Sequence, residues 1–185
     1  MELVLVHPEI PHNTGCAARL SAALGLPLHL VEPLGFSLED KYLKRAGLDY
    51  WPLVELVVHP NWEAALATLA RGSRRPIEER LKLFSARGGS SLFATEFLPD
   101  DVLVFGCESQ GLPPAIVKGR EARRVYVPIR PAIRSLNLAN VVCLATYTAM
   151  VRAGMELPEN DGAHAPLPAM KDDVRPSSRT RRVDA

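Results

Sequence analysis

A series of short apolar runs, each closed by a loop rich in glycine or proline, limits the folds open to this sequence. Apolar residues on both faces of a short strand are typical of a parallel sheet that helices cover on both sides. Helices are expected over Thr14–Leu24, which ends at Gly25, around Leu38–Ala46, and over Trp62–Ala70. Strands that alternate with helices predict an α/β fold with a mostly parallel sheet and flanking helices. The expected strands are Leu3–Val6, Leu28–Val31, Leu53–Val58, Leu81–Ser85, Val102–Gly106 and Arg124–Ile129.

The chain is expected to consist of one domain and a tail. Its 185 residues, 47% of them hydrophobic, are enough for one core and too few for two domains of ordinary size. We place the domain at residues 1–155. Residues 156–185 are rich in proline, carry charges of both signs and hold few large apolar side chains, so we expect a flexible tail.

Basic residues are clustered, although the formal net charge is only +1. Between residues 118 and 134 the only acidic residue is Glu121, which makes this stretch a basic patch. A second basic group, between Arg71 and Arg87, is diluted by Glu78 and Glu79. The alternative for both groups is the solvated face of an ordinary helix. The first cluster contains Lys118, Arg120, Arg123, Arg124, Arg130 and Arg134.

Several classes of protein are disfavoured. The three cysteines, Cys16, Cys107 and Cys143, form no C-x-x-C pair, so we expect no disulfide scaffold and no metal, and a reducing, cytoplasmic location fits. The amino-terminal run MELVLVHPEI reads as a strand without a basic leader or a cleavage site, so no secretory signal is expected. The uncharged run from Ser135 to Val151 is shorter than the ~18 apolar residues of a membrane span, so no membrane partner is expected.

Two polar loops are expected where ligands bind in open parallel sheets, at the carboxyl ends of the strands. In the first, NTGCAAR, Asn13 is a good N-cap for the following helix, and a capped helix with a surface arginine, Arg19, is the alternative to a site. In the second, VFGCESQGLP, Glu108 stands between Gly106 and Gly111, which can expose backbone groups to a ligand. A plain glycine turn is the alternative there. Cys107 has no activating base in its motif, and a space-filling role is expected.

A third polar loop precedes the most apolar helix of the chain. Arg134, Ser135, Asn137 and Asn140 fall within seven residues. Either Ser135 or Asn137 would suffice to cap the helix, which leaves an arginine and at least one amide unexplained by capping. The helix itself, in the run up to Val151, is hydrophobic on nearly every face, so it should be buried all round. A sheet can cover only one side, and we therefore expect a second copy of the chain to cover the other in a symmetric dimer.

Taken together and in this order, N-T-G-x-x-A-R, F-G-x-E-x-x-G-L and R-S-L-N-L-x-N resemble the signatures of the SPOUT (trefoil-knot) RNA 2′-O-ribose methyltransferases. LHLVEPLGF (Leu28–Phe36) and KRAGLDYW (Lys44–Trp51) resemble the subgroup that methylates the wobble nucleotide, cytidine or modified uridine, of the tRNA anticodon. The resemblance covers residues 2–153. It implies a deep C-terminal trefoil knot, a homodimer, S-adenosylmethionine as cofactor and tRNA as partner.

The resemblance also implies roles for individual residues. Arg19 would act on the ribose hydroxyl, Asn13 and Glu108 would orient Arg19, and Ser135 and Asn137 would hold the ribose and cofactor ends of the site. The implied cofactor-binding residues are Phe84, Gly106, Val127, Ile129, Ser135 and Leu138. Phosphates of the RNA would meet Arg123, Arg124, Arg130 and Arg134.

Alternatives remain at this stage for the chemistry and for the substrate. Arg19 either acts as a base with help from an RNA phosphate or stays charged and stabilises the alkoxide, since a free guanidinium has a pKa above ~12. The substrate is either a tRNA wobble ribose or a ribose of another RNA such as ribosomal RNA, and a third hypothesis is a knotted RNA-binding module without turnover. The chain departs from the subgroup at Cys16, Cys107 and Gln110, where asparagine, proline and arginine are common. Gln110 removes a possible phosphate contact.

Overall fold

The computed structural model describes residues 1–38, 51–159, 162 and 181–183. The helix expected around Leu38–Ala46 falls almost wholly outside the described residues, and so does most of the expected tail.

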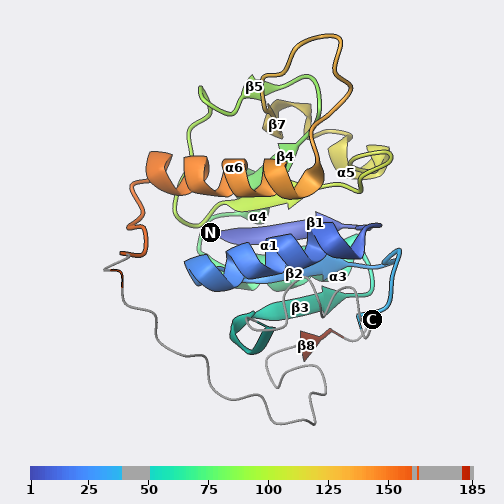
Figure 1. Ribbon diagram of the computed structural model, residues 1–185, viewed down its shortest axis with the longest axis vertical. Helices are drawn as coiled ribbons and strands as arrows, with labels where there is room; N and C mark the ends of the chain where they lie inside the picture. Colours follow the sequence, from blue (N-terminus) through green and yellow to red (C-terminus); the bar gives the residue numbers. More distant parts are fainter. Residues whose placement is uncertain (39–50, 160–161, 163–180, 184–185) are drawn as a thin grey trace.

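In this part of the chain, eight strands form a single sheet, and every pair of neighbouring strands is parallel (Figure 1). The order across the sheet is β5-β7-β4-β6-β1-β2-β3-β8, so β1 lies in the middle between β6 and β2. The predicted parallel α/β class is therefore confirmed. The strands are β1 Glu2–Val6, β2 Leu28–Val31, β3 Leu56–His59, β4 Leu81–Phe84, β5 Ser90–Ser91, β6 Val102–Phe105, β7 Arg124–Tyr126 and β8 Arg181–Arg182.

Helices cover both faces of the sheet. The two long helices, α1 (Pro11–Leu24) and α6 (Leu138–Arg152), lie side by side across one face, and α3 (Trp62–Leu69) lies on the other (Figure 1). The remaining helical segments among the described residues are the short helices α4 (Ile77–Arg80) and α5 (Pro114–Val117) and the 3-10 turns η1 (Trp51–Leu53), η2 (Ala70–Gly72) and η3 (Glu121–Arg123).

Several predicted boundaries were wrong, and proline accounts for most of the differences. Helix α1 begins at Pro11 instead of Thr14, because proline fits the first position of a helix, where its missing N–H is not needed. The third strand begins at Leu56 instead of Leu53, because the segment around Pro52 forms the turn η1. Strand β7 stops at Tyr126, two residues before Pro128, which cannot donate to a strand ladder. The end of α1 was predicted correctly, since Gly25 adopts the left-handed conformation at φ 65°.

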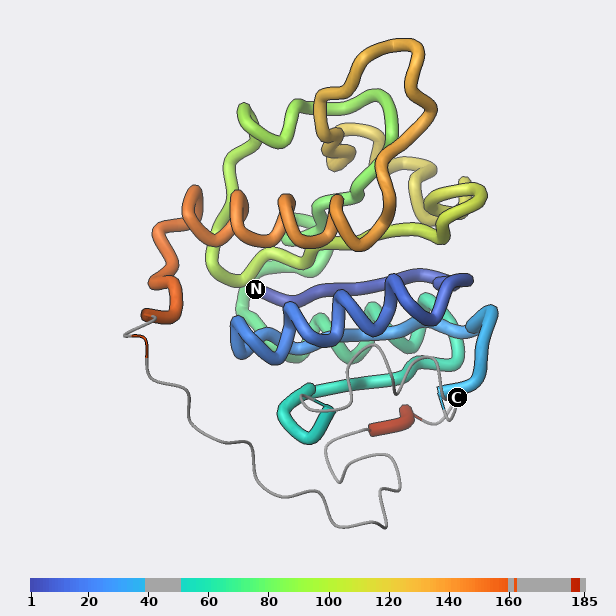
Figure 2. The backbone as a smooth tube through the Cα atoms, viewed as in Figure 1, coloured from blue at the N-terminus to red at the C-terminus, as the bar shows by residue number. Residues whose placement is uncertain are grey.

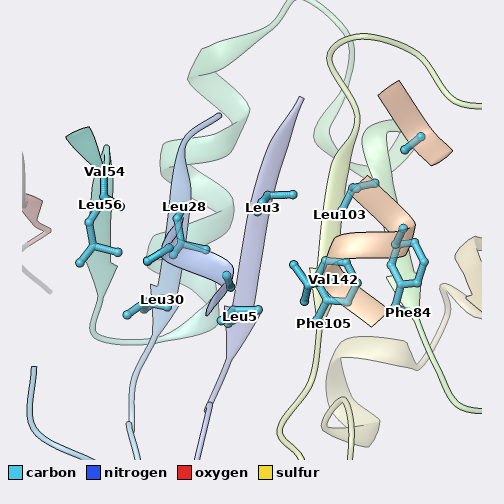
Figure 3. Close-up of a cluster of buried hydrophobic side chains, with 14 of the residues drawn as sticks. Leu3, Leu5, Leu28, Leu30, Val54, Leu56, Phe84, Leu103, Phe105 and Val142 are labelled. Carbon is cyan, nitrogen blue, oxygen red and sulfur yellow. The ribbon is translucent and has the colours of Figure 1, made fainter. Parts of the chain in front are cut away.

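The two faces of each strand supply two separate apolar layers. Leu3 and Leu5 of β1 pack with Leu28 and Leu30 of β2 beneath α1 and α6, as Figure 3 shows together with Val142 of α6. The alternate residues of β1 and its neighbours face α3 and pack with Trp62. Near the carboxyl ends of β4 and β6 the rings of Phe84 and Phe105 stack with their centroids 4.5 Å apart. Burial on both faces explains why the strands are apolar without alternation.

A hydrogen-bonded chain of polar side chains, most of them buried, lies on the α3 face of the sheet. His29 Nδ1 lies 2.9 Å from His59 Nε2, and His29 Nε2 lies 3.1 Å from Glu2 Oε2. Arg80, only 1% exposed, donates from Nη2 to Glu2 Oε1 at 2.8 Å and from Nη1 to the carbonyl of Leu69 at 2.6 Å. Each buried charge in this chain therefore has an oppositely charged or strongly polar partner, which is the condition for burying it at tolerable cost.

His59, the last residue in this series of hydrogen-bonded side chains, resists protonation. If a neutral His29 donates from Nε2 to Glu2, its Nδ1 accepts from His59 Nε2–H, and His59 Nδ1 is then a bare lone pair. That atom is buried without a hydrogen-bond partner, so a proton placed there would be an unsatisfied buried donor. Burial, and then the neighbouring His29, lower the pKa of His59 to about 4 from its ordinary value of 6.5.

We expect the free energy of unfolding to fall as the pH is lowered from 6.5 to 4. The unfolded chain binds a proton at His59 near pH 6.5 and the folded protein only near pH 4, so the neutral folded form is fully favoured above pH 6.5. The loss across this window is about 3 kcal/mol at most. The pKa of Glu2 is also lowered: burial opposes this, but hydrogen bonds from His29 and Arg80 outweigh it, so Glu2 adds a further loss below its ordinary pKa of 4.5. Urea unfolding at several pH values measures the slope.

The variant His59→Gln tests the assignment, because its amide can still donate to His29 but does not titrate in this range. Its unfolding free energy should change much less between pH 6.5 and 4.5 than that of the wild type. The exposed His12→Gln serves as a control and should keep the wild-type slope. Equal slopes in the wild type and His59→Gln would contradict the prediction.

Candidate functional site

Three loops that follow β1, β6 and β7 meet at the carboxyl edge of the sheet. The last of them, residues 127–137, leaves the end of β7 as an arch and returns to the start of α6 (Figure 2). The loops enclose a pocket of about 690 Å³. The pocket is lined by residues from all three loops and from the end of β4, among them Ile10, Asn13, Phe84, Ser85, Arg87, Gly106, Glu108, Ser109, Gly111, Arg124, Val127, Ile129, Arg134, Ser135, Asn137 and Leu138.

The carboxylate of Glu108 holds the start of α1. Its Oε2 accepts a hydrogen bond from the backbone N–H of Glu9 at 2.8 Å, and its Oε1 accepts from the N–H of Ile10 at 3.3 Å. Oε1 also accepts from Asn13 Nδ2 at 2.8 Å. The N–H groups at the start of a helix have no partner within the helix. The Glu108 carboxylate, which comes from another loop, accepts hydrogen bonds from the two N–H groups just before α1 and lies at the positive end of this helix.

Two asparagines extend this network to the start of α6. Asn137 donates from Nδ2 to Asn13 Oδ1 at 3.0 Å, and its own Oδ1 accepts from the backbone N–H of Asn140 at 3.3 Å, which makes Asn137 the N-cap of α6. Asn137 was one of the two predicted caps. The predicted capping role of Asn13 was wrong: α1 begins earlier, at Pro11, and the buried side chain of Asn13 links Glu108 to Asn137 instead.

The loop after β6 is a tight turn that requires glycine. The N–H of Cys107 donates to the Gly111 carbonyl at 3.2 Å, and the N–H of Gly111 donates back at 2.9 Å. A Cβ on Gly106 would lie 2.0 Å from the carbonyl carbon of Gly111, and Gly111 itself has φ +75°. The thiol of Cys107 lies 3.5 Å from the same carbonyl oxygen, inside the turn. Glycine here brings two backbone segments together at the wall of the pocket.

All six residues predicted to bind the cofactor line this pocket: Phe84, Gly106, Val127, Ile129, Ser135 and Leu138. Ile10, Ser85 and Leu136 also line the pocket and were not predicted from the sequence. Ser85 directly follows β4, so the rule that ligands bind at the carboxyl ends of strands could have found it.

The predicted RNA-binding arginines are in different situations. Arg134 lines the pocket and donates from Nη2 to the Ser109 carbonyl at 2.8 Å. Arg124 also lines it, and its guanidinium lies against Gly88. Arg123 donates to the Glu79 carbonyl at 3.3 Å. Arg130 is exposed and is not among the lining residues.

One arginine of the basic cluster is paired with an acid from the second basic group. Arg120 makes a two-bond ion pair with Glu78, at 2.6 Å from Nε and 2.7 Å from Nη2, and this pair lowers the pKa of the Glu78 carboxyl. The positive patch is therefore weaker than the sequence alone indicates.

Comparison with known proteins identifies the family of this chain. The model of the SpoU rRNA Methylase family matches residues 1–147. The chain belongs to this family. It is 44% identical, over 90% of its length and 96% of the relative, to the tRNA (cytidine(34)-2′-O)-methyltransferase of Polaromonas sp. (strain JS666), and 47% identical, over 80% and 88%, to that of Acidovorax sp. (strain JS42).

Solved structures agree with this assignment. A structure from work on the 2-OH methylation of C/U34 on tRNA is 46% identical, covers 83% of this chain and 95% of its own, and superposes with a TM-score of 0.75. The SpoU methyltransferase AviRb of Streptomyces viridochromogenes, in complex with AdoMet, is 22% identical over 82% of this chain and 57% of its own, and its TM-score of 0.68 supports the shared fold.

Arg19, the residue predicted to act on the ribose hydroxyl, does not line the pocket. The residue is exposed on α1, six residues beyond Asn13. The hydrogen bonds described above for Asn13 and Glu108 join these residues to each other, to Asn137 and to the backbone before α1. The predicted orientation of Arg19 by Asn13 and Glu108 therefore stays a prediction.

Helix α6 leaves an apolar stripe uncovered. Its inner face is buried against the sheet through residues such as Val142, Ala145 and Ala149. On the outer face Leu144, Tyr147 and Val151 are 39%, 41% and 60% exposed. These three residues follow the three- and four-residue spacing of one helix face, and a single chain does not bury them.

Two negative findings concern the described residues only. No helix among them is long and apolar enough to cross a membrane. They also contain no group of three or more histidine, cysteine, aspartate or glutamate side chains placed to hold a metal ion.

We expect Glu108→Gln to lower the free energy of unfolding by about 1–3 kcal/mol. The substitution keeps the shape of the side chain but turns one acceptor into an N–H₂ donor, which then faces either the Glu9 N–H or the donors of Ile10 and Asn13. Urea unfolding at pH 7.5 measures the change. Glu63→Gln, on the exposed start of α3, removes the same charge and should have little effect; an unchanged midpoint for Glu108→Gln would rule out this account of the loop.

Proposed function

We propose that this protein transfers a methyl group from S-adenosylmethionine to the 2′-hydroxyl of the wobble nucleotide, cytidine or modified uridine, in the tRNA anticodon. The observation that carries the proposal is the 44% identity, over 90% of this chain, to a tRNA (cytidine(34)-2′-O)-methyltransferase. The pocket at the carboxyl edge of the sheet supports it, because the residues that the resemblance assigns to the cofactor all line it. The substrate and the three free cysteines fit an enzyme of the cytoplasm.

The residues of the pocket fit the cofactor. Its volume of about 690 Å³ is within the usual range for small-molecule sites. Phe84, Val127 and Leu138 offer apolar surface suited to a neutral adenine ring, and the turn from Gly106 to Gly111 offers backbone groups for polar contacts. When bound, the cofactor supplies an activated methyl group on a sulfonium centre.

The arch of residues 127–137 is the part of the chain that we propose to be knotted. Arg87, in the loop after β4, donates from Nη2 to the carbonyls of Pro131 at 3.0 Å and Ile133 at 2.8 Å. These bonds join the loop after β4 to the segment leading to α6, which supports the proposal that this loop encloses that segment. A trefoil knot here would fix three walls of the pocket relative to one another.

Arg19, Ser135 and Asn137 would act on the target ribose. A ribose hydroxyl is a very weak acid, so its proton has to leave or its oxygen has to be polarised during the transfer. Arg19 either accepts that proton with help from an RNA phosphate or remains a cation and stabilises the alkoxide. Ser135 and Asn137 line the pocket and are exposed, so they would hold the ribose at the correct distance.

We propose that the site is completed by a second copy of the chain. Arg19 and the stripe of Leu144, Tyr147 and Val151 lie on the two helices that cover the same face of the sheet, and both are exposed. A partner packed on this face would bury the stripe and bring its own Arg19 to the pocket that lacks one. Arg123, Arg124, Arg130 and Arg134 would then hold phosphates of tRNA lying across both subunits.

The experiment that tests the function uses isotopically labelled S-adenosylmethionine and unmodified tRNA, with mass spectrometry of the digested nucleosides. The wild type should place label on the 2′-oxygen of the wobble pyrimidine. Arg19→Ala should abolish this transfer, because the hydroxyl is no longer activated, while calorimetry still finds S-adenosylmethionine bound.

Two outcomes would redirect the assignment. Label on ribosomal RNA instead of tRNA would move the substrate, and cofactor binding without any transfer would favour an RNA-binding module. A folded Arg19→Ala protein that no longer bound S-adenosylmethionine would show that Arg19 has a different role. Loss of transfer without loss of binding is the expected pattern.

Mixed dimers test whether the site is shared. Arg19→Ala and Ser135→Ala chains, each inactive alone, are co-expressed with different tags and purified as a mixed dimer with twice the chain mass of 20.3 kDa. The Arg19→Ala chain keeps an intact pocket and should receive Arg19 from its partner, so the mixed dimer should methylate tRNA. An inactive mixed dimer would mean that Arg19 serves its own chain, and a monomer in light scattering would exclude the shared site.

A further inference from the structure

A second carboxylate, that of Glu9, binds the loop after β6 in the opposite direction to Glu108. Glu9 Oε2 accepts from the backbone N–H of Ser109 at 3.0 Å, and Glu9 Oε1 accepts from Ser109 Oγ at 2.7 Å. Glu108, in turn, accepts from the N–H of Glu9 at 2.8 Å. Each loop therefore gives its carboxylate to backbone N–H of the other, in a reciprocal pair of the kind that closes a capping box. We call Glu9 and Ser109, with these bonds, the Glu9–Ser109 clasp.

The backbone of Glu9 is itself held in place. The N–H of Gly35, in the loop after β2, donates to the Pro8 carbonyl at 2.9 Å. A Cβ on Gly35 would lie 2.7 Å from Glu9 Cα, so the two loops are in direct backbone contact there. The contact between the loops after β1 and β2 thus fixes the backbone from which the Glu9 side chain extends to Ser109.

Ser109 also binds the third loop, the one that follows β7. Its carbonyl accepts from Arg134 Nη2 at 2.8 Å, and Ser109 and Arg134 both line the pocket. Ser109 also follows Glu108 directly and lies within the turn between Gly106 and Gly111. The clasp and the bond from Arg134 therefore join the loops after β1, β6 and β7 beside the pocket.

The charge of Glu9 is unfavourable for the proposed partner. Glu9 is exposed beside a face that would carry RNA phosphates, and a carboxylate there repels them. A charge that opposes substrate binding, and whose two oxygens both accept hydrogen bonds from one serine, indicates a role in geometry. Charge-assisted hydrogen bonds are stronger than neutral ones, which suits a group that must hold a loop.

We propose that Glu9 and Ser109 are positioning residues of the methyl-transfer site, which fix the Gly106–Gly111 wall of the pocket and the guanidinium of Arg134. Neither residue needs to touch the reacting atoms. The effect on catalysis rests on the proposed function, whereas the effect on the loop does not.

The test compares Glu9→Ala, Ser109→Ala, the double variant and Glu9→Gln. Glu9→Ala should raise the KM for S-adenosylmethionine about tenfold, since two hydrogen bonds to a charged group are lost, and should lower kcat less. The double variant should be no worse than Glu9→Ala, because both changes remove the same bonds. Glu9→Gln keeps a carbonyl acceptor for Ser109 and should recover part of the loss, which removal of charge alone would not predict.

Glu63→Ala is the matched control, because it removes one negative charge from an exposed position on the α3 face. It should keep wild-type KM and kcat. If Glu9→Ala behaves like Glu63→Ala, or if it changes only the KM for tRNA, the positioning role is wrong. Should Glu9→Ala fail to fold, Ser109→Ala alone must still raise the KM for S-adenosylmethionine, by a smaller factor.

Amide hydrogen exchange separates this proposal from the proposed function. The Ser109 amide should exchange faster in Glu9→Ala than in the wild type, whether or not the protein methylates RNA. Unchanged exchange at Ser109 would overturn the clasp. A wild type that neither binds S-adenosylmethionine nor transfers methyl groups would instead overturn the proposed function and confine the clasp to the fold of the loops.

Discussion

The carboxylate of Glu108 connects the two long helices of the protein to the edge of the sheet. It accepts from the backbone before α1 and from Asn13, and Asn13 accepts from Asn137, the cap of α6. Both helices on this face consequently begin at the same place, with their positive ends directed toward the pocket. A change in any one of these three side chains would alter the start of both helices, because each one binds the next.

Polar groups on the α3 face of the sheet and at its carboxyl edge have different roles. On the α3 face His29, His59 and Arg80 are buried, and their hydrogen-bond partners lie within the protein. At the carboxyl edge the polar groups lie among apolar walls, and Ser135 and Arg134 are exposed at the pocket. Buried networks of the first kind stabilise one arrangement of the core, and open ones of the second kind leave donors and acceptors available to a ligand.

The sequence was sufficient for the parts of the structure that local chemistry determines. The continuous apolar strands predicted a parallel sheet covered on both faces, and the glycine that ends α1 was identified from its position alone. The rule that ligands bind at the carboxyl ends of parallel strands placed the three polar loops together, and the six residues that the family resemblance assigned to the cofactor line the pocket there.

The partners of individual side chains could not be predicted in this way, because they come from distant parts of the chain. Asparagine is a common N-cap residue, but the side-chain amide of Asn13 donates to a carboxylate 95 residues away in the sequence. Glu78 was treated as a diluting charge within its own segment, whereas it pairs with Arg120 of another. Glu9 belongs to no motif, and only the fold brings Ser109 to it.

The short strands at the two ends of the sheet, β5 and β8, affect how the protein behaves in a crowded solution. Each is two residues long, and β8 consists of two exposed arginines beside the longer strand β3. An outer strand this short offers almost no backbone to which another chain could add, and adjacent guanidinium groups repel a second copy of themselves. A sheet whose inner strands are mostly apolar and buried therefore ends in short outer strands that discourage edge-to-edge aggregation.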